Sequence, residues 1–208
     1  MKGESTARSE EPIPWQRPTT GGILRAAERV FARQGYAETS LRRLIAEAGV
    51  STTAFYARFP SKEAVLDALI AELLGELYEA AARALGEART LEEGFDRGVE
   101  VLVRVLADRR DLVRLALTEA SCSGSARGTI QAAYSMLASL LGAKFKHLVD
   151  RGSINLIDAE AFGWALVGAL QMQVVRWAVY DELDDEGLAR SLRSTARSLL
   201  PLVQRPGE

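Results

Sequence analysis

Six residues within a twelve-residue stretch could together contact a polyanion. They share hydroxyl or cationic tips: Ser51, Thr52, Thr53, Tyr56, Arg58 and Lys62. No acidic residue lies between positions 49 and 62. Short hydroxyl side chains can reach base edges or a thymine methyl group, whereas Tyr56 and Lys62 suit backbone phosphates and Arg58 suits either. The stretch is therefore predicted to approach DNA.

Two short helices would have to position these residues. Thr39 or Ser40 can cap a helix that ends at Gly49, because glycine readily adopts the left-handed backbone that stops a helix. Val50 fills the angle between the two helices, and Ser51 caps a second helix from Thr52 to about residue 59. These dimensions predict a helix-turn-helix whose second helix projects its N-terminus toward a phosphate.

The rest of the chain is also predicted to be helical, because apolar residues recur at spacings of three and four. We expect a first helix after Thr19 or Thr20 that stops at Gly35, and further helices beginning near positions 61, 90, 111, 129, 158 and 184, with a Ser/Gly-rich loop at 121–128. The predicted fold is all-α. Residues 1–16 are expected to be a disordered tail, 17–62 a three-helix DNA-binding domain, and 63–208 a helical-bundle domain for ligand binding and dimerisation.

Charge is distributed unevenly between the two predicted domains, although the net charge of the chain is only −2. Residues 17–62 hold eight basic residues against three acidic ones, whereas residues 63–208 hold sixteen against twenty-two. Such asymmetry indicates an anion-binding module joined to a body that the same polyanion would repel.

Composition excludes several other kinds of site. With Cys122 as the only cysteine and His147 as the only histidine, the chain has no intrachain disulfide and no Cys/His zinc cluster, and we expect no metal and no cofactor. Cys122 is interpreted either as a redox or electrophile sensor or as a small residue in a loop. No secretory or membrane-spanning stretch is recognised, so a cytoplasmic location without membrane contact is expected.

The stretch from Thr39 to Glu63 resembles the signature of the TetR family of transcriptional regulators. Its Thr-rich start, Ala-Gly-Val-Ser turn, Tyr-x-x-Phe ending and Ser-Lys-Glu helix start occur in that family at this spacing. The resemblance implies that the third helix enters the major groove, that Tyr56 and Lys62 hold phosphates, and that a dimer reads a palindromic operator. Thr39, Ser40 and Arg42 complete the predicted DNA-binding set.

The same resemblance implies that the C-terminal body binds an effector and forms the dimer. For a pocket, the sequence offers polar or aromatic residues within apolar helices: Phe95, Tyr134, Trp164, Gln171 and Gln173. Each of these could instead pack in the core or lie at the surface.

Helix 161–180 is apolar nearly all round, which predicts burial on one side by its own core and on the other by a partner. With the narrow apolar seam of the last helix, it would form a homodimer interface through a two-fold axis. The predicted interface residues are Leu166, Leu170, Val174, Trp177, Leu188, Leu192 and Leu199. The alternative is a monomer that buries both helices internally.

Three classes of function therefore compete. An enzyme is disfavoured, because the sequence has no Glu-x-x-His pair, no Gly-rich phosphate loop and no Ser/His/Asp set. A helical adaptor would not need a basic stretch free of acid. The favoured hypothesis is a dimeric repressor released from double-stranded DNA when a small-molecule effector changes the separation of its two recognition helices.

Overall fold

The computed structural model describes residues 19–88, 90–118 and 124–199, and these residues form nine helices and no strand. The helices are α1 (Thr20–Gln34), α2 (Leu41–Ala48), α3 (Thr52–Tyr56), α4 (Lys62–Glu87), α5 (Leu91–Asp108), α6 (Arg110–Thr118), α7 (Gly124–Asp150), α8 (Ala159–Ala178) and α9 (Asp185–Leu199). The all-helical prediction is confirmed. The expected tail at 1–16 and Cys122 lie outside the described residues.

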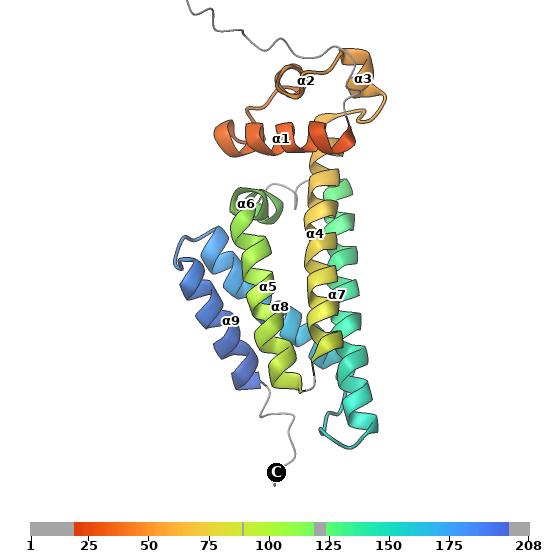
Figure 1. Cartoon of the computed structure of the whole chain (residues 1–208), viewed down its shortest axis with the longest axis vertical. Coiled ribbons are helices and arrows are strands. Elements are labelled where there is room, and N and C mark those ends of the chain that lie inside the picture. Colours follow the sequence, from red (N-terminus) through yellow and green to blue (C-terminus); the bar gives the residue numbers. More distant parts are fainter. Residues whose placement is uncertain (1–18, 89, 119–123, 200–208) are drawn as a thin grey trace, which may run out of the picture.

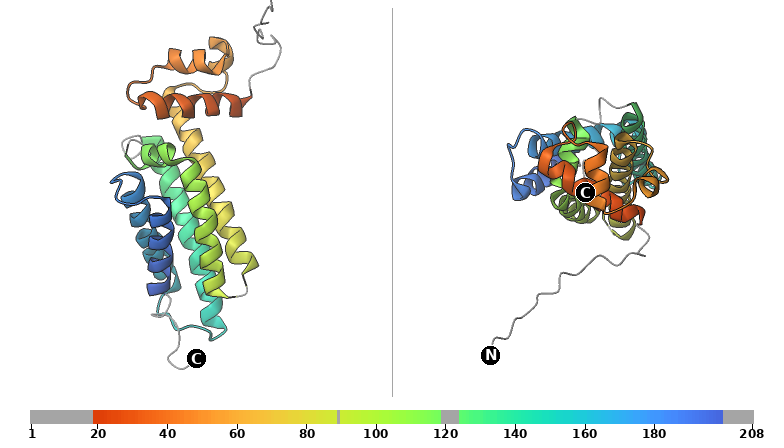
Figure 2. Two further views of the ribbon diagram at one scale, coloured as in Figure 1. Left: turned by 60° about the vertical axis from the view of Figure 1, so that its left-hand side comes forward. Right: turned by 90° about the horizontal axis from the view of Figure 1, so that it is seen from above.

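The molecule is elongated, with α1, α2 and α3 at one end of a bundle formed by the longer helices (Figure 1). Helix α1 lies across the top of this bundle, and α2 and α3 lie on the side of α1 that faces away from it (Figures 1 and 2). Helix α4 begins beside α3 and runs down the body, so one continuous helix crosses the domain boundary expected at residues 62 and 63.

Side-chain caps explain where most of these helices begin. A hydroxyl or carboxylate oxygen accepts a hydrogen bond from the backbone N–H three residues later, at 2.6–3.2 Å, in the caps formed by Thr19, Ser40, Ser51, Ser61, Thr90, Asp158 and Asp184. Of the alternatives predicted for α1 and α2, the caps are Thr19 and Ser40 rather than Thr20 and Thr39, and the predicted start of α3 at Ser51 is confirmed. The local sequence therefore sets the helix starts almost to the residue.

Two predicted boundaries are wrong. Helix α3 ends at Tyr56, about three residues earlier than expected, and the chain turns before Pro60. Helix α7 begins at Gly124, so the second half of the expected Ser/Gly-rich loop is helical. The physical reason at α7 is tertiary packing: Ala126 is completely buried in the core, and this packing overrides the weak helix propensity of its neighbours.

One buried cluster joins α1, α2 and α3 to the body, which is the bundle of the longer helices. It includes Ile23 of α1, Phe55 of α3 and Leu66 of α4, and it continues to Leu112 of α6 and Trp177 of α8. Because α1 to α3 share this core with the body, a displacement of α4 or α6 would be felt at α1.

A second cluster fills the lower end of the bundle, where the rings of Phe145 and Phe162 meet edge to face at 4.9 Å. Here α7 and α8 approach so closely that a Cβ atom on Gly163 would lie 2.6 Å from the carbonyl oxygen of Ala138. Only glycine fits this contact without movement of the two backbones, and α8 is thereby held against α7.

Candidate nucleic-acid interface and ligand cavity

The turn between α2 and α3 has the geometry predicted for it. Gly49 has φ 63° and ψ 32°, which is the left-handed conformation, and its N–H donates to Ala46 O at 3.2 Å. Ser51 then begins α3 by accepting a hydrogen bond from Ala54 N–H at 3.1 Å. Phe55 and Phe59 are buried at 0% and 5% exposure, so they anchor α3 to the core and fix which face of α3 points outward.

The opposite face of this turn and helix exposes most of the predicted DNA-binding side chains. Exposed positions at α2 and α3 are Ser40, Arg42, Ser51, Thr52, Thr53, Tyr56 and Arg58. Tyr56 is half exposed at 50%, although its ring edge still packs against Phe55 at a centroid distance of 6.1 Å. Arg58 donates to Ala54 O at 3.3 Å and remains at the surface. This surface presents hydroxyls and two guanidinium groups, those of Arg42 and Arg58.

Thr39 is a correction to the predicted set, because its side chain is buried at 2% exposure. Its hydroxyl donates to Gly35 O at 2.6 Å and accepts from the Gln34 amide at 3.1 Å. Both hydrogen-bonding functions are thus used within the chain, and no surface remains for a phosphate to contact. Thr39 instead ties the end of α1 to the start of α2.

Lys62 is half-buried at the first residue of α4. Its ammonium donates to Tyr36 O at 2.9 Å and to Ala37 O at 3.4 Å, and it lies 4.3 Å from the centroid of the Tyr36 ring. These contacts hold the charge beside the loop that precedes α2. The role of Lys62 in DNA binding stays a prediction. Its contacts with Tyr36 and Ala37 would hold the amine in place before a phosphate binds.

A cluster around Glu47 was missed from the sequence. The Glu47 carboxylate lies 2.8 Å from the guanidinium of Arg33, 3.6 Å from that of Arg29 and 3.7 Å from that of Arg43. The hydrogen bond from Arg33, together with the charges of all three arginines, holds the pKa of Glu47 below its ordinary value. Only the Arg43–Glu47 pair, four apart on one helix, could have been found from spacing.

The pairing of three arginines leaves a smaller set of cations for other contacts. Among the described residues up to position 62, Arg25, Arg42, Arg58 and Lys62 take part in no ion pair. These four residues, rather than all the basic residues of this region, supply its unpaired positive charge.

The body contains a partly open cavity of about 460 Å³ lined by α4, α5, α6, α7 and α8. Its wall is apolar except for Tyr134, Gln171 and Tyr180. Three of the five predicted pocket residues line it, namely Phe95, Tyr134 and Gln171. Burial raises the pKa of the Tyr134 phenol above its ordinary value, so the hydroxyl keeps its proton at neutral pH.

The other two predicted pocket residues lie elsewhere. Trp164 is 43% exposed and borders a shallow groove with Arg127 and Gln131 on the outer face of α7 and α8. The Gln173 amide oxygen accepts from Arg176 at 3.0 Å and from Ser191 at 2.7 Å, so it links α8 to α9. Gln171 and Gln173 are two positions apart, and on a helix that spacing points them to nearly opposite sides.

The predicted dimer residues also need correction. Four of them are no more than 1% exposed within this single chain and offer a partner no surface: Leu166, Trp177, Leu188 and Leu192. Leu170 and Val174 line the cavity, and Leu199 is half-buried against the lower cluster. The exposed apolar face of α8 is formed instead by Ala161, Trp164, Ala165, Gly168 and Met172. The sequence could not distinguish these faces, because α8 is apolar on both.

Arg109, at the junction of α5 and α6, connects the body to α1. Its guanidinium donates to both carboxylate oxygens of Glu28 at 2.9 and 3.1 Å, and it lies 3.3 Å from Glu76 and 3.6 Å from Glu72 of α4. Burial works against the charge on Arg109, but the hydrogen bonds and charge of Glu28, with the two other carboxylates, outweigh it and raise its pKa. Eighty-one positions separate Arg109 from Glu28, so no sequence pattern reveals the pair.

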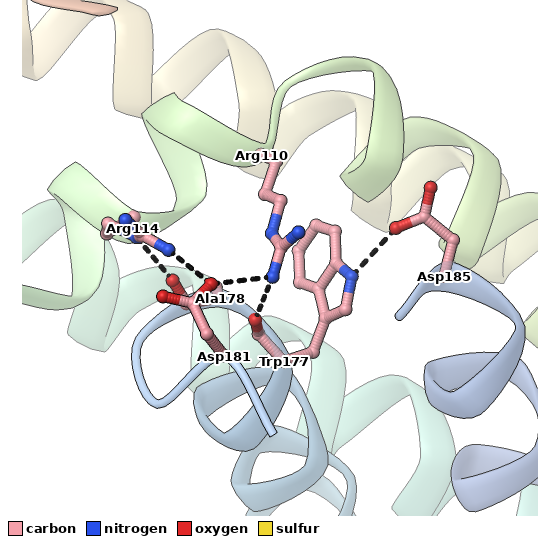
Figure 3. Close-up of polar contacts among 6 residues, drawn as sticks. All are labelled: Arg110, Arg114, Trp177, Ala178, Asp181 and Asp185. Atoms are coloured by element: carbon pink, nitrogen blue, oxygen red, sulfur yellow. Dashed lines mark hydrogen bonds and ion pairs between the residues drawn. The ribbon is translucent and has the colours of Figure 1, made fainter. Parts of the chain in front are cut away.

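Two arginines of α6 hold the end of α8 (Figure 3). Arg110 donates to Trp177 O at 2.5 Å and stacks over the Trp177 ring at 4.7 Å, and Arg114 donates to Ala178 O at 2.5 Å. Both also pair with Asp181, at 2.9 and 2.6 Å. Because the same helix α6 lines the cavity through Val113, Ala116 and Leu117, it contacts the cavity, the end of α8 and, through Arg109, helix α1.

Comparison with known proteins identifies the upper domain. Residues 23–69 match the family described as bacterial regulatory proteins, tetR family. The HTH-type transcriptional regulator YuxN of Bacillus subtilis is 26% identical over 99 residues, which are 48% of this chain and 34% of that protein. EthR of Mycolicibacterium smegmatis is 37% identical over 78 residues, 38% of this chain and 30% of EthR. The matched segments thus span about a third of these curated relatives.

Solved structures match over nearly the whole chain. A TetR-family regulator from Syntrophomonas wolfei has a TM-score of 0.76 at 19% identity and covers 86% of this chain and 93% of its own. Thermus thermophilus FadR, a TetR-family repressor in complex with lauroyl-CoA, has a TM-score of 0.64 at 29% identity over 88% and 93% of the two chains. Bacillus subtilis FadR in complex with stearoyl-CoA has a TM-score of 0.72 at 22% identity over 88% and 97%.

No described helix is long and apolar enough to cross a membrane. The described residues also contain no group of three or more His, Cys, Asp or Glu side chains placed to hold a metal ion.

Proposed function

The chain belongs to the TetR family of DNA-binding bacterial regulators, and we propose that it is a repressor which binds a palindromic operator as a dimer and is released by a small-molecule effector. One observation supports the proposal: the exposed, acid-free face of α3 and the apolar cavity are connected through the fold. Helix α6 lines the cavity, and Arg109 at the start of α6 is hydrogen-bonded to Glu28 of α1, the helix that supports α2 and α3.

The DNA contact would be made by the outer face of α3. Thr52 and Thr53, at its N-terminal turn, would reach into the major groove, where short hydroxyl and methyl groups read base edges. Ser51, Tyr56 and Arg58 would contact the flanking phosphates, and Ser40 and Arg42 would do so from the start of α2. The buried rings of Phe55 and Phe59 keep this face in one orientation, which a specific contact requires.

The dimer would form on the exposed apolar face of α8. Trp164 at 43% and Met172 at 52% exposure flank the small residues Ala165 and Gly168 on this face. Large apolar side chains beside small ones allow two copies of the same helix to pack closely about a two-fold axis. Two α3 helices related by that axis would then meet successive half-sites, about 34 Å apart along DNA.

The effector would occupy the cavity in the body. Two FadR structures similar to this chain, from Thermus thermophilus and Bacillus subtilis, are complexes with lauroyl-CoA and stearoyl-CoA. Their ligands support a site for a long-chain molecule in a fold of this kind, and the apolar wall of the present cavity fits the acyl chain of such a ligand.

Release would pass through α6. A ligand that fills the cavity presses on Val113, Ala116 and Leu117, and α6 is tied at its start to α1 through the Arg109–Glu28 pair. A change in α6 would therefore change the direction of α1 and of the α2–α3 unit that it supports. The ligand would bind more tightly to the arrangement that does not fit the operator, and operator affinity would fall by the factor that separates the two ligand affinities.

The test is selection of bound duplexes from random and genomic DNA by the purified full chain, followed by a salt titration. We expect a palindrome with half-sites one helical turn apart and an affinity that falls steeply with salt. A Thr53→Ala variant should lose affinity for the selected site, and an exposed control on the far end of α7, Lys146→Gln, should not. Weak binding with no sequence preference in the wild type would refute the proposal.

A further inference from the structure

The wall of the cavity indicates what part of a ligand it can hold. None of the residues that line it carries a carboxylate, an ammonium, a guanidinium or an imidazole. An ionised group placed among apolar side chains without a partner is strongly disfavoured. The portion of the ligand inside the cavity must therefore be uncharged.

The cavity is elongated along the helices. Its lining residues run from Leu73 to Leu85 on α4 and from Gly94 to Leu106 on α5, a rise of about 18 Å on each helix at about 1.5 Å per residue. A sphere of the same volume of about 460 Å³ would be only about 10 Å across, so the space is long and narrow. An extended chain advances about 1.2 Å per bond, and about 14 chain atoms would fill this length.

Of the three polar side chains in the wall, Tyr180 is 60% exposed, whereas the other two make no hydrogen bond to the described residues. They are the amide of Gln171 and the hydroxyl of Tyr134, both half-buried. The contrast with Gln173 is informative, because that amide bonds to both Arg176 and Ser191. Polar groups turned away from bulk water are normally paired, so these two are available for a polar atom of the ligand.

The polar groups lie part-way along the cavity, and one end of it is wholly apolar. From Tyr134 to Leu141 on α7 the wall descends about 10 Å, and the side chains there include Leu85, Phe95 and Val167. This segment has room for an alkyl tail of about eight bonds beyond the polar group.

We propose that the effector is an uncharged long-chain molecule of about 14 chain atoms, in which one carbonyl or hydroxyl group hydrogen-bonds Gln171 and Tyr134 and the alkyl tail points toward Phe95. The proposal rests on the proposed function, since it names the ligand class of the same regulatory site. It separates this chain from a receptor for a free carboxylate, whose charge would meet the apolar wall, and from a receptor for an acyl-CoA, whose phosphates would find no cation among the lining residues.

The test compares three probes with the same acyl chain, whose tail matches the apolar end of the cavity: butyl nonanoate, nonanoate at pH 8, and nonanoyl-CoA. Each is titrated against the full chain loaded with an apolar fluorescent dye, and displacement of the dye gives the apparent Kd. We expect the butyl ester to bind at least about tenfold more tightly than either anionic probe. Gln171→Leu and Tyr134→Phe should each weaken ester binding by about 5- to 10-fold, whereas Gln131→Leu, outside the cavity, should not.

Several outcomes would overturn the proposal. Equal or tighter binding of nonanoate or of the thioester would show that the site accommodates an anionic group. A preference for the thioester that Arg127→Gln abolishes would place the head group in the outer groove that Arg127 shares with Tyr134. Ester binding that neither cavity variant weakens would remove the assigned hydrogen bonds. Operator binding without any probe is measured in parallel, so a failure here is distinct from failure of the proposed function.

Discussion

The Arg109–Glu28 pair gives the sharpest test of how the body controls the DNA-binding helices. Glu28→Gln keeps the shape of the side chain and removes its charge. In the wild type the two residues share two hydrogen bonds of 2.9 and 3.1 Å, and Arg109 is only 12% exposed while Glu28 is 28% exposed. The variant weakens a bidentate, partly desolvated contact between α1 and the start of α6.

The magnitude follows from the burial of the pair. Breaking a fully buried pair costs about 3–5 kcal/mol, whereas an exposed pair contributes about 0–1 kcal/mol. Glu72 and Glu76 remain beside Arg109 in the variant and are about half exposed, so the guanidinium is not left without a counter-charge. We therefore expect a loss of about 1–2 kcal/mol, which lowers the Tm by about 2–6 °C for a chain of this size.

The functional assay is operator affinity with and without saturating butyl nonanoate. If the pair transmits the ligand's effect, the ligand raises the operator Kd of Glu28→Gln by less than about fivefold, whereas it raises the operator Kd of the wild type by more. Glu76→Gln is the matched control, because Glu76 contacts the same guanidinium at 3.3 Å but belongs to α4. The reasoning is refuted if Glu28→Gln lowers the Tm as expected and keeps the full ligand response.

Four other predictions address the interface, the cavity, the dimer and the core. Thr53→Ala and Tyr56→Phe should each weaken operator binding by about 1–3 kcal/mol without changing the Tm; unchanged binding would remove the residue from the site. As pH rises above about 10, the Tyr134→Phe variant should lose less stability than the wild type. In the wild type, burial raises the pKa of the Tyr134 phenol, so the unfolded chain releases this proton at a lower pH than the folded chain does, and the folded state is destabilised on the alkaline side. Gly168→Arg should shift sedimentation from dimer to monomer with little change in monomer stability, since a side chain there meets no atom within 4 Å of its Cβ. Gly163→Ala should destabilise the chain by about 1–3 kcal/mol in urea unfolding, whereas Gly168→Ala, on the same helix in open space, should not.

Local signals in the sequence determine the elements that present the site. Serine and threonine at positions 40, 51 and 61 cap α2, α3 and α4, and the left-handed Gly49 turns the chain between α2 and α3. Each of these depends on atoms within three or four residues of one another, so a single sequence contains the necessary information. The exposed hydroxyl face of α3 follows once Phe55 and Phe59 are recognised as core.

Contacts between distant segments could not be predicted in the same way. Thr39 is polar and next to a helix start, yet the fold places it against Gly35 and Gln34, where it is buried. Glu47 gathers two arginines from α1 only because α1 and α2 cross at that point. Helix α8 is apolar on all sides, and the choice between its core face and its exposed face depends on where α7 and α9 pack.

The strength of the tie between body and α1 limits how strongly a ligand can act through it. If the Arg109–Glu28 contact contributes about 1–2 kcal/mol, one bound ligand can shift operator affinity through it by about 5- to 30-fold, since about 1.4 kcal/mol corresponds to tenfold. A dimer has two such contacts, and two ligands acting independently multiply the effect to about 25- to 900-fold. Release would then be graded, since one bound ligand already lowers operator affinity by about 5- to 30-fold and the full loss requires occupancy of both cavities.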